Sequence, residues 1–345
     1  TSIFLKSEYV FVLNSFIDRL SRIITIDKED EEKKYSIYTY KAMDPKNIIH
    51  NLTYSPWFYL LLCIVIFILV SKFNVSTSEG FHQASEFVYL KECSKIYDTF
   101  YSEIYDDLFY TPYRAKTDTD DIVKITKLSN NSTILDVGSG TGSHIKEFIL
   151  QGANVYGIDI SPQMSKVAKR TNPSANIKVS DVTNAIAYPS DTFTHISCLY
   201  FTIYYIQDKH QFFLNAYDWL EKDGFLIIHL VNRDMFDPIL PAANPLYMVS
   251  PQKYAKERIT NSGIKFKDFE YKSQFFTDKD SNSAIFEETF KDDLSGHIRK
   301  QQHKLYMNTQ KDIIQLAKKS GFNVVHKTDL VNTQYEYQYL YYLQK

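Results

Sequence analysis

The chain has 345 residues, a formal net charge of −2 and a hydrophobic content of 44%. This length is sufficient for one large domain with attachments. A net charge so close to zero excludes binding to nucleic acid through the overall charge, and we expect no nucleic-acid partner. The three cysteines, Cys63, Cys93 and Cys198, are far apart and match no metal-ligand spacing, so we expect no metal site.

Residues 1–47 form a region of their own ahead of a long apolar run. Apolar residues recur at helical spacing between Tyr9 and Ile23, which predicts an amphipathic helix. This is either an ordinary amphipathic helix or one that binds a protein partner or a membrane interface. The mixed-charge run that follows, Lys28 to Lys34, is typical of a solvated linker.

Residues 48–73 form a second region, which carries a predicted transmembrane helix. Fourteen consecutive apolar residues run from Trp57 to Val70, and no Lys, Arg, Asp or Glu lies between Lys46 and Lys72. A helix needs about 20 mostly apolar residues to cross a bilayer. We expect a single-pass membrane protein, whose organelle and orientation the sequence leaves open. The alternative is a buried helix of the soluble domain.

The third region, 78–345, begins with a predicted helix over 78–95 and continues into an aromatic segment at 97–113. That segment contains FYSEIYDDL, in which Tyr101 and Tyr105 lie four residues apart. These rings either cover a ligand or pack on the sheet as an aromatic stripe, and both alternatives stay open.

The most informative stretch is ILDVGSGTG, from Ile134 to Gly142. The protein contains only 10 glycines, and three of them, Gly138, Gly140 and Gly142, lie in this stretch. The pattern predicts a buried strand that ends in a turn too tight for most side chains, followed by a helix. The next predicted strand, VYGID, ends in Asp159. Such a strand, turn, helix and second strand with an acid at its end make a nucleotide-binding unit.

The spacing of these glycines indicates which class of ligand the turn binds. A dinucleotide-binding turn reads G-x-G-x-x-G, whereas this turn reads G-x-G-x-G with Asp136 two residues before its first glycine. The stretch therefore resembles motif I of the class I S-adenosylmethionine (SAM)-dependent methyltransferases, D-x-G-x-G-x-G. The resemblance extends from Tyr97 to the C-terminus and implies that SAM is the cofactor. A glycine turn without a ligand is the alternative.

The resemblance also implies which residues bind SAM. Asp159 occupies the position at which the family holds the two ribose hydroxyls, a task that suits the two oxygens of a carboxylate. Asp181 follows a predicted third strand at 177–179 and matches the acid that reaches the adenine amine, or it is an ordinary loop aspartate. Tyr105 matches a segment that caps the cofactor. The predicted cofactor-binding residues are Asp136, Gly138, Ser139, Gly140, Gly142, Asp159, Ile160, Asp181, Val182, Leu199 and Tyr105.

Later segments continue in the order that the resemblance implies. A fourth strand from Phe193 leads to Leu199, which would lie beside the methionine end of the cofactor. A helix over 208–221 and a turn at Gly224 precede a fifth strand at 225–231.

Three polar residues, Tyr200, Tyr204 and His229, lie near the carboxyl ends of the fourth and fifth strands, where ligands bind in such sheets. His229 is either a general base or a core histidine. We therefore leave the catalytic residues unassigned.

Residues 233–262 contain four prolines, which predicts an irregular segment able to act as a lid. Three alternating runs within 264–307 predict antiparallel strands. The basic residues of the last run, Arg299, Lys300, His303 and Lys304, are expected to be solvated. A helix over 309–320 and strands at 322–330 and 335–344 would complete the sheet.

The predicted fold is thus α/β, with a Rossmann-like seven-stranded methyltransferase sheet and an antiparallel strand insertion, preceded by a single transmembrane helix. The insertion resembles that of amino-sugar N-methyltransferases and glycine N-methyltransferase-like enzymes, which implies a small-molecule acceptor. We expect a membrane-anchored methyltransferase that acts on a nitrogen or an oxygen. One alternative is a structural methyltransferase-like subunit of a membrane complex or virion. Another is an enzyme acting on a lipid or quinone-like head group.

Overall fold

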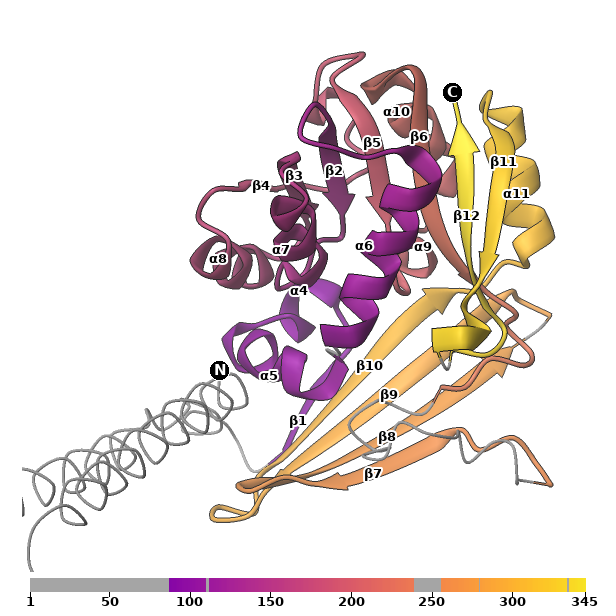
Figure 1. Cartoon of the computed structure of the whole chain (residues 1–345). Helices are drawn as coiled ribbons and strands as arrows, with labels where there is room; N and C mark the ends of the chain where they lie inside the picture. Colours follow the sequence, from indigo (N-terminus) through magenta and orange to yellow (C-terminus); the bar gives the residue numbers. More distant parts are fainter. Residues whose placement is uncertain (1–86, 110–111, 239–255, 279, 334) are drawn as a thin grey trace, which may run out of the picture. The chain divides into compact units, whose positions relative to one another are not determined.

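The computed structural model describes residues 87–109, 112–238, 256–278, 280–333 and 335–345 (Figure 1). These residues belong to one compact unit, Thr77–Lys345, which is distinct from Thr1–Ser76. The amphipathic helix, the linker and the transmembrane helix predicted within residues 1–73 lie outside the described residues. None of the helices described is long and apolar enough to cross a membrane.

A seven-stranded sheet with the order β11-β12-β6-β5-β2-β3-β4 forms the centre of this unit (Figure 1). Its strands are β2 (Thr133–Val137), β3 (Asn154–Asp159), β4 (Asn176–Val179), β5 (Phe193–Cys198), β6 (Leu220–Val231), β11 (Asn323–Asp329) and β12 (Gln338–Gln344). Strands β2 to β6 pair in parallel, whereas β12 is antiparallel to both β6 and β11. The predicted α/β sheet is therefore confirmed.

The sequence explains why these strands are central. In β2, Ile134, Leu135 and Val137 are almost fully buried, and such continuous apolar runs are typical of parallel strands covered on both faces. The covering helices are α6 (Pro112–Thr126), α7 (Ser143–Leu150), α8 (Pro162–Thr171), α10 (Lys209–Trp219) and α11 (Gln310–Lys319). Helix α8 begins where Ser161 Oγ accepts a hydrogen bond from Met164 N, with Pro162 in its first turn.

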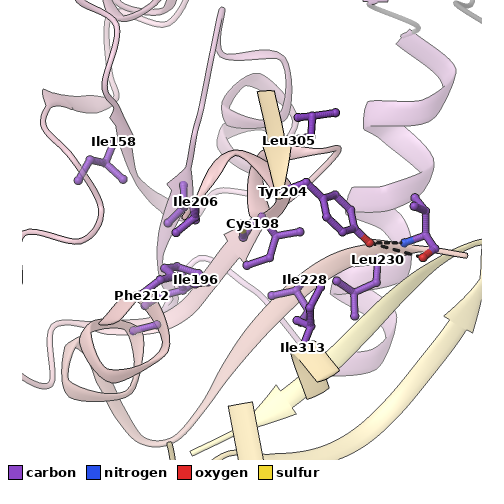
Figure 2. Packing of buried hydrophobic residues seen from close by; sticks show 14 of the residues in the cluster. Ile158, Ile196, Cys198, Tyr204, Ile206, Phe212, Ile228, Leu230, Leu305 and Ile313 are labelled. Atoms are coloured by element: carbon purple, nitrogen blue, oxygen red, sulfur yellow. Dashed lines mark hydrogen bonds between the residues drawn. The ribbon is translucent and has the colours of Figure 1, made fainter. Parts of the chain in front are cut away.

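The apolar core continues from the central sheet into the rest of the unit (Figure 2). Ile228 and Leu230 from β6 belong to the same buried cluster as Leu305 and Ile313. Tyr204 reaches into this cluster, and its hydroxyl accepts a hydrogen bond from Val231 N at 2.8 Å. A buried phenol is thus satisfied by the backbone at the end of a central strand.

A second sheet, with the order β1-β10-β9-β8-β7, lies toward the carboxyl ends of β2, β5 and β6 (Figure 1). Its strands are β1 (Phe87–Leu90), β7 (Asn261–Lys265), β8 (Phe269–Asp278), β9 (Ser283–Asp292) and β10 (Ile298–Tyr306). Strands β7 to β10 are antiparallel, which confirms the predicted insertion. The run expected as one strand at 264–276 is divided between β7 and β8.

The helix predicted over 78–95 is wrong within the described residues. Phe87–Leu90 is strand β1 and pairs in parallel with β10, so only the short α4 (Cys93–Ile96) is helical. The residues Phe-Val-Tyr-Leu favour a strand, and pairing with the edge of β10 outweighs helix formation. Helix α5 (Thr99–Phe109) then crosses the unit, and the short α9 (Thr202–Tyr205) follows β5.

Two further expectations need correction. The helix expected over 208–221 ends at Trp219, and β6 starts at Leu220, so Gly224 lies inside the strand rather than before it. The backbone is nevertheless irregular next to Gly224, because Asp223 has a positive φ of 63°. Leu220 is fully buried, so burial of its side chain favours the early start of the strand.

Candidate functional site

A cavity of about 1020 Å³ opens at the carboxyl ends of β2, β3 and β5. The chain order of the strands reverses at β2, and ligands of open α/β sheets bind at such switch points. The structure brings together at this cavity all but one of the predicted cofactor-binding residues: Tyr105, Asp136, Gly138, Ser139, Gly140, Asp159, Ile160, Asp181, Val182 and Leu199. Gly142 is the exception.

The glycines of the turn after β2 have different surroundings. A Cβ atom on Gly140 would meet nothing within 4 Å, so this residue faces open space in the cavity. A Cβ atom on Gly142 would lie 2.5 Å from Nδ2 of Asn172, which belongs to the end of α8. Both residues have positive φ angles, 54° and 87°. Gly140 therefore leaves room for a ligand, whereas Gly142 allows close packing of the protein.

Two backbone amides hold the carboxylate of Asp159. Its Oδ2 accepts a hydrogen bond from Gly140 N at 2.8 Å, and its Oδ1 accepts one from Ser161 N at 2.8 Å. Burial raises the pKa of Asp159, and these two hydrogen bonds oppose that shift. Each oxygen retains acceptor capacity, so the carboxylate is oriented by the glycine turn and can still accept from a ligand.

The other two acids of the site have different environments. Asp136 is 4% exposed, and its Oδ1 accepts a hydrogen bond from Ser197 Oγ at 2.8 Å. Burial raises its pKa to about 6. Asp181 is held in a local turn, because its Oδ1 accepts from both the amide and the hydroxyl of Thr183 at 2.8 Å.

Helix α5 covers the cavity and is tied to the loops below it. Tyr105 stacks on Phe109 with ring centroids 4.7 Å apart. The neighbouring Asp106 accepts a hydrogen bond from Thr141 Oγ1, in the glycine turn, at 2.6 Å. Ser161 Oγ donates to the carbonyl oxygen of Tyr97 at 2.9 Å. Residues 97–109 are therefore held over the site by specific hydrogen bonds.

Sequence reasoning missed Arg114, which also lines the cavity. Its guanidinium is 2% exposed and lies between the rings of Tyr200, at 4.5 Å, and Tyr335, at 3.7 Å. Its Nε donates to Asp118 Oδ2 at 3.3 Å. The spacing of Arg114 and Asp118 is typical of an ion pair along a helix, but nothing local indicated that this pair is buried.

His229 is a core histidine and does not line the cavity. It is fully buried, and burial together with Arg114 lowers its pKa to about 3. Its Nε2 lies 3.2 Å from Nη2 of Arg114. Tyr200, which precedes α9, does line the cavity and has a φ of 51°. Within the described residues its buried hydroxyl has no hydrogen-bond partner.

The second sheet contributes the opposite wall of the same cavity. Phe275, Phe286, His303 and Leu305 lie on its inner face and line the space. His303 is 2% exposed and Arg299 is 8% exposed, so the expectation that this basic group is solvated is wrong for both. Alternation along β10 turns these residues inward, while Lys304 stays exposed.

Comparisons with known proteins cover the part of the chain that carries this site. Residues 135–228 match the methyltransferase domain family. A dTDP-4-amino-2,3,4,6-tetradeoxy-D-glucose N,N-dimethyltransferase from Saccharopolyspora spinosa is 30% identical over 120 residues, which are 34% of this chain and 47% of that protein. A phosphoethanolamine N-methyltransferase from Plasmodium falciparum is 27% identical over 170 residues, or 45% of this chain and 57% of that protein. The chain thus spans about half the length of these two curated relatives.

Solved structures show the same fold at low sequence identity. A methyltransferase from Streptomyces caelestis superposes with a TM-score of 0.55 at 12% identity, covering 72% of this chain and 96% of that one. An amino pentose methyltransferase from Micromonospora echinaspora, solved with SAM bound, gives 0.51 at 16% identity, covering 71% and 95%. The matched region is similar to methyltransferase domains, and the fold is that of the class I SAM-dependent methyltransferases. Among these proteins the domain resembles the amino-sugar N-methyltransferases.

Proposed function

We propose that this protein transfers a methyl group from SAM to a nitrogen or an oxygen of a small-molecule acceptor. The observation that carries the proposal is the continuity of the cavity. One space is lined by Asp159 and Gly140 at one end and by Phe286 and His303 of the second sheet at the other. A donor and an acceptor bound at these two ends would meet inside it.

The residues present fit SAM. Asp159 is proposed to hold the ribose hydroxyls, because its carboxylate is already oriented by Gly140 N and Ser161 N. Gly140 leaves the space that the cofactor would fill. Asp181 is proposed to reach the adenine amine, Leu199 to lie beside the methionine end and Tyr105 to cap the cofactor. When bound, SAM supplies a methyl group already activated as a sulfonium, so the protein positions the acceptor and excludes water.

The acceptor is proposed to be a small polar molecule that carries an amine or a hydroxyl. The two relatives named above act, by their names, on an amino sugar nucleotide and on phosphoethanolamine. The acceptor end of the cavity supports a compact molecule, because aromatic side chains such as Phe236, Phe275 and Phe286 enclose it.

Calorimetry with SAM tests the proposal. We expect a dissociation constant in the micromolar range, equivalent to roughly −8 kcal/mol. Mass spectrometry should then detect methylation when phosphoethanolamine or the dTDP-amino sugar is offered as acceptor. Folded protein that shows no heat of SAM binding would contradict the proposal and favour a structural methyltransferase-like subunit instead.

We further propose that residues 48–73 anchor the domain to a membrane as a single span. About 24 residues free of Lys, Arg, Asp and Glu would rise about 36 Å as a helix, enough for the ~30 Å hydrocarbon core. Alkaline carbonate should leave the full chain in the membrane pellet and release a fragment that starts at Ser78. Full-length protein in the supernatant would contradict the anchor.

A further inference from the structure

Three polar side chains form a chain of hydrogen-bond contacts from the cavity into the second sheet. The Tyr205 hydroxyl, from α9, lies 3.1 Å from Nδ1 of His303. Nε2 of His303 in turn lies 2.7 Å from Oε2 of Glu288. Tyr205 and His303 line the cavity, whereas Glu288 is fully buried behind them. The roles proposed above for the cofactor-binding residues involve none of these three groups.

Glu288 is surrounded by hydrogen-bond donors. Besides His303, its carboxylate lies within 2.7 Å of the hydroxyls of Tyr101 and Tyr271 and of Nε2 of Gln301. Burial raises the pKa of Glu288, but the hydrogen bonds from His303, Tyr101 and Tyr271 more than offset burial and hold that pKa below its usual range. Glu288 is therefore a carboxylate at neutral pH and acts only as an acceptor.

The ionised Glu288 determines the protonation pattern of its neighbours. Because a carboxylate only accepts, Nε2 of His303 carries the hydrogen that lies between them. In a neutral imidazole Nδ1 is then the acceptor, so Tyr205 donates its hydroxyl hydrogen to Nδ1. The Tyr205 oxygen also interacts with the Tyr97 hydroxyl, and its second lone pair can accept from a group in the cavity that Tyr205 lines.

We propose that Tyr205 accepts the proton of the bound methyl acceptor while passing its own hydroxyl proton to Nδ1 of His303. This inference rests on the proposed function, because it requires a protonated nucleophile in the cavity. Tyr205 would be the catalytic residue, since it would contact the acceptor. His303 would receive the proton, and Glu288 would be a positioning residue that never touches the acceptor.

The step balances in protons and electrons. The N–H or O–H bond of the acceptor breaks, and its electron pair stays on the acceptor atom. That proton bonds to the Tyr205 oxygen as the Tyr205 O–H bond breaks toward His303 Nδ1, so the tyrosine ends neutral. The freed pair bonds to the methyl carbon as the carbon–sulfur bond breaks and leaves its electrons on sulfur. One proton is then stored on the imidazole.

The surroundings favour this direction of transfer. Protonated His303 would form an ion pair with Glu288 across 2.7 Å, and charge-assisted hydrogen bonds of this kind are strong in buried sites. A free tyrosinate is disfavoured, because burial raises the pKa of Tyr205. Concerted transfer through Tyr205 avoids forming that anion. The rings of Tyr97, Tyr101 and Phe286 pack around the imidazole, with centroids between 5.6 and 5.8 Å away.

Nitrogen NMR on the full chain labelled with ¹⁵N-histidine tests the relay without any acceptor. With S-adenosylhomocysteine added at about pH 8, we expect His303 to be protonated on Nε2 and not on Nδ1. Tyr205→Phe should shift the Nδ1 resonance, and Glu288→Gln should populate the other tautomer, because an amide can donate as well as accept. Protonation of wild-type His303 on Nδ1, or an unchanged Nδ1 resonance in Tyr205→Phe, would overturn the proposal.

Tyr342→Phe is the matched control. Its hydroxyl also forms a hydrogen bond with a side chain, donating to Oδ2 of Asp121 at 2.7 Å, but Tyr342 does not line the cavity. This variant should leave the His303 resonances unchanged. A shift as large as that in Tyr205→Phe would mean that loss of any buried hydroxyl disturbs the domain, and the relay would lose its support.

A kinetic measurement separates this inference from the proposed function. With the dTDP-amino sugar as probe, Tyr205→Phe should lower kcat about a hundredfold and change KM little, since general base catalysis contributes 10²–10⁴-fold. Its affinity for S-adenosylhomocysteine should stay at the wild-type value. Wild-type protein that binds no S-adenosylhomocysteine would refute the proposed function itself. Active wild type with full kcat in Tyr205→Phe would refute the relay alone.

Discussion

The two ends of the cavity are built in different ways. The end proposed to bind the cofactor is built mainly of backbone amides and strand-end carboxylates from one stretch, Asp136 to Val182, with Tyr105 and Leu199 added from outside it. The acceptor end joins residues that are remote in sequence: the Tyr101 hydroxyl donates to Glu288, 187 positions later. The first end depends on backbone conformation and local turns, and the second on side chains that meet only after two sheets have packed. Substitutions should therefore have separable effects at the two ends.

The largest expected effect is on cofactor binding, in Gly140→Val. The added side chain would enter the open space next to Gly140 and should weaken SAM binding by more than about a thousandfold, or ~4 kcal/mol. A valine at a φ of 54° is also strained, which should cost about 1–2 kcal/mol of stability. Calorimetry and thermal unfolding would measure the two effects.

Gly263→Val is the matched control for that substitution. A Cβ atom on Gly263 also meets nothing within 4 Å, but this residue lies in β7 of the second sheet. SAM affinity should be unchanged. Normal SAM binding by folded Gly140→Val would show that the turn does not face the cofactor.

At the acceptor end the largest effect should be on stability, in Glu288→Ala. Removal of this buried carboxylate leaves Tyr101, Tyr271, Gln301 and His303 without their shared acceptor. The free energy of unfolding should fall by about 3–5 kcal/mol, as measured by urea denaturation. Protein that remains folded should still bind SAM, because the cofactor end is intact.

Glu287→Ala provides the comparison on the outer face of the same strand. Glu287 pairs with Lys300 at 2.8 Å, with both side chains partly exposed. Such pairs contribute about 0–1 kcal/mol. Equal losses in the two variants would contradict the view that the buried network supports the acceptor end.

A smaller effect on binding is expected in Asp159→Asn. The amide would replace one acceptor oxygen beside Gly140 N and the ribose, so SAM affinity should fall about a hundredfold, or ~2.7 kcal/mol. Asp329→Asn is the matched control, because Asp329 also ends a strand and accepts from the amide two residues later, at 3.0 Å, outside the cavity. An unchanged SAM affinity in Asp159→Asn would contradict the proposed role of Asp159 in holding the ribose.

The smallest effect concerns the pH dependence of stability at Asp136. Its pKa is raised by burial to about 6 in the folded protein, against about 3.9 in an unfolded chain. The neutral form therefore stabilises the fold: its contribution is complete below about pH 4 and is lost as the pH rises through 6. Asp136→Asn keeps the acceptor for Ser197 and stays neutral. Its stability relative to wild type should increase by about 1–3 kcal/mol between pH 4 and pH 7.

Comparison of urea denaturation curves at the two pH values gives this difference directly. Burial also raises the pKa values of Asp106 and Asp159, so the pH dependence of the wild type alone is not diagnostic. Parallel pH profiles for wild type and Asp136→Asn would show that Asp136 is already ionised in the fold.

The contrast between the two ends also explains what the sequence could predict. The proposed cofactor end could be predicted because a glycine turn, a strand and a terminal acid are consecutive in the chain. Of the predicted residues, all but Gly142 line the cavity. Gly142 belongs to the same motif, but there the glycine allows close packing against Asn172. Motif spacing indicates where glycine is required, and not which neighbour requires it.

The residues of the acceptor end could not be predicted from the sequence, for a physical reason. Arg299, Gln301 and His303 alternate along β10, and a strand with polar residues on one face is normally expected to turn that face to solvent. Here they face inward because Glu288 and Asp98 supply partners from other elements. The available signal was Leu305, which continues the same alternation and is buried. The strand β1 was missed similarly, because its partner lies far along the chain.

That first strand also bears on how the domain folds. The Tyr89 hydroxyl of β1 lies 3.3 Å from Glu287, a contact that spans 198 positions, and β1 pairs with β10 along its length. During synthesis on the ribosome this strand must wait until most of the domain has emerged before it can pair. Contacts of such sequence separation slow folding, and meanwhile β1 stays unpaired, with edges able to pair with other chains. The acceptor end of the cavity should therefore be the last part of the domain to form.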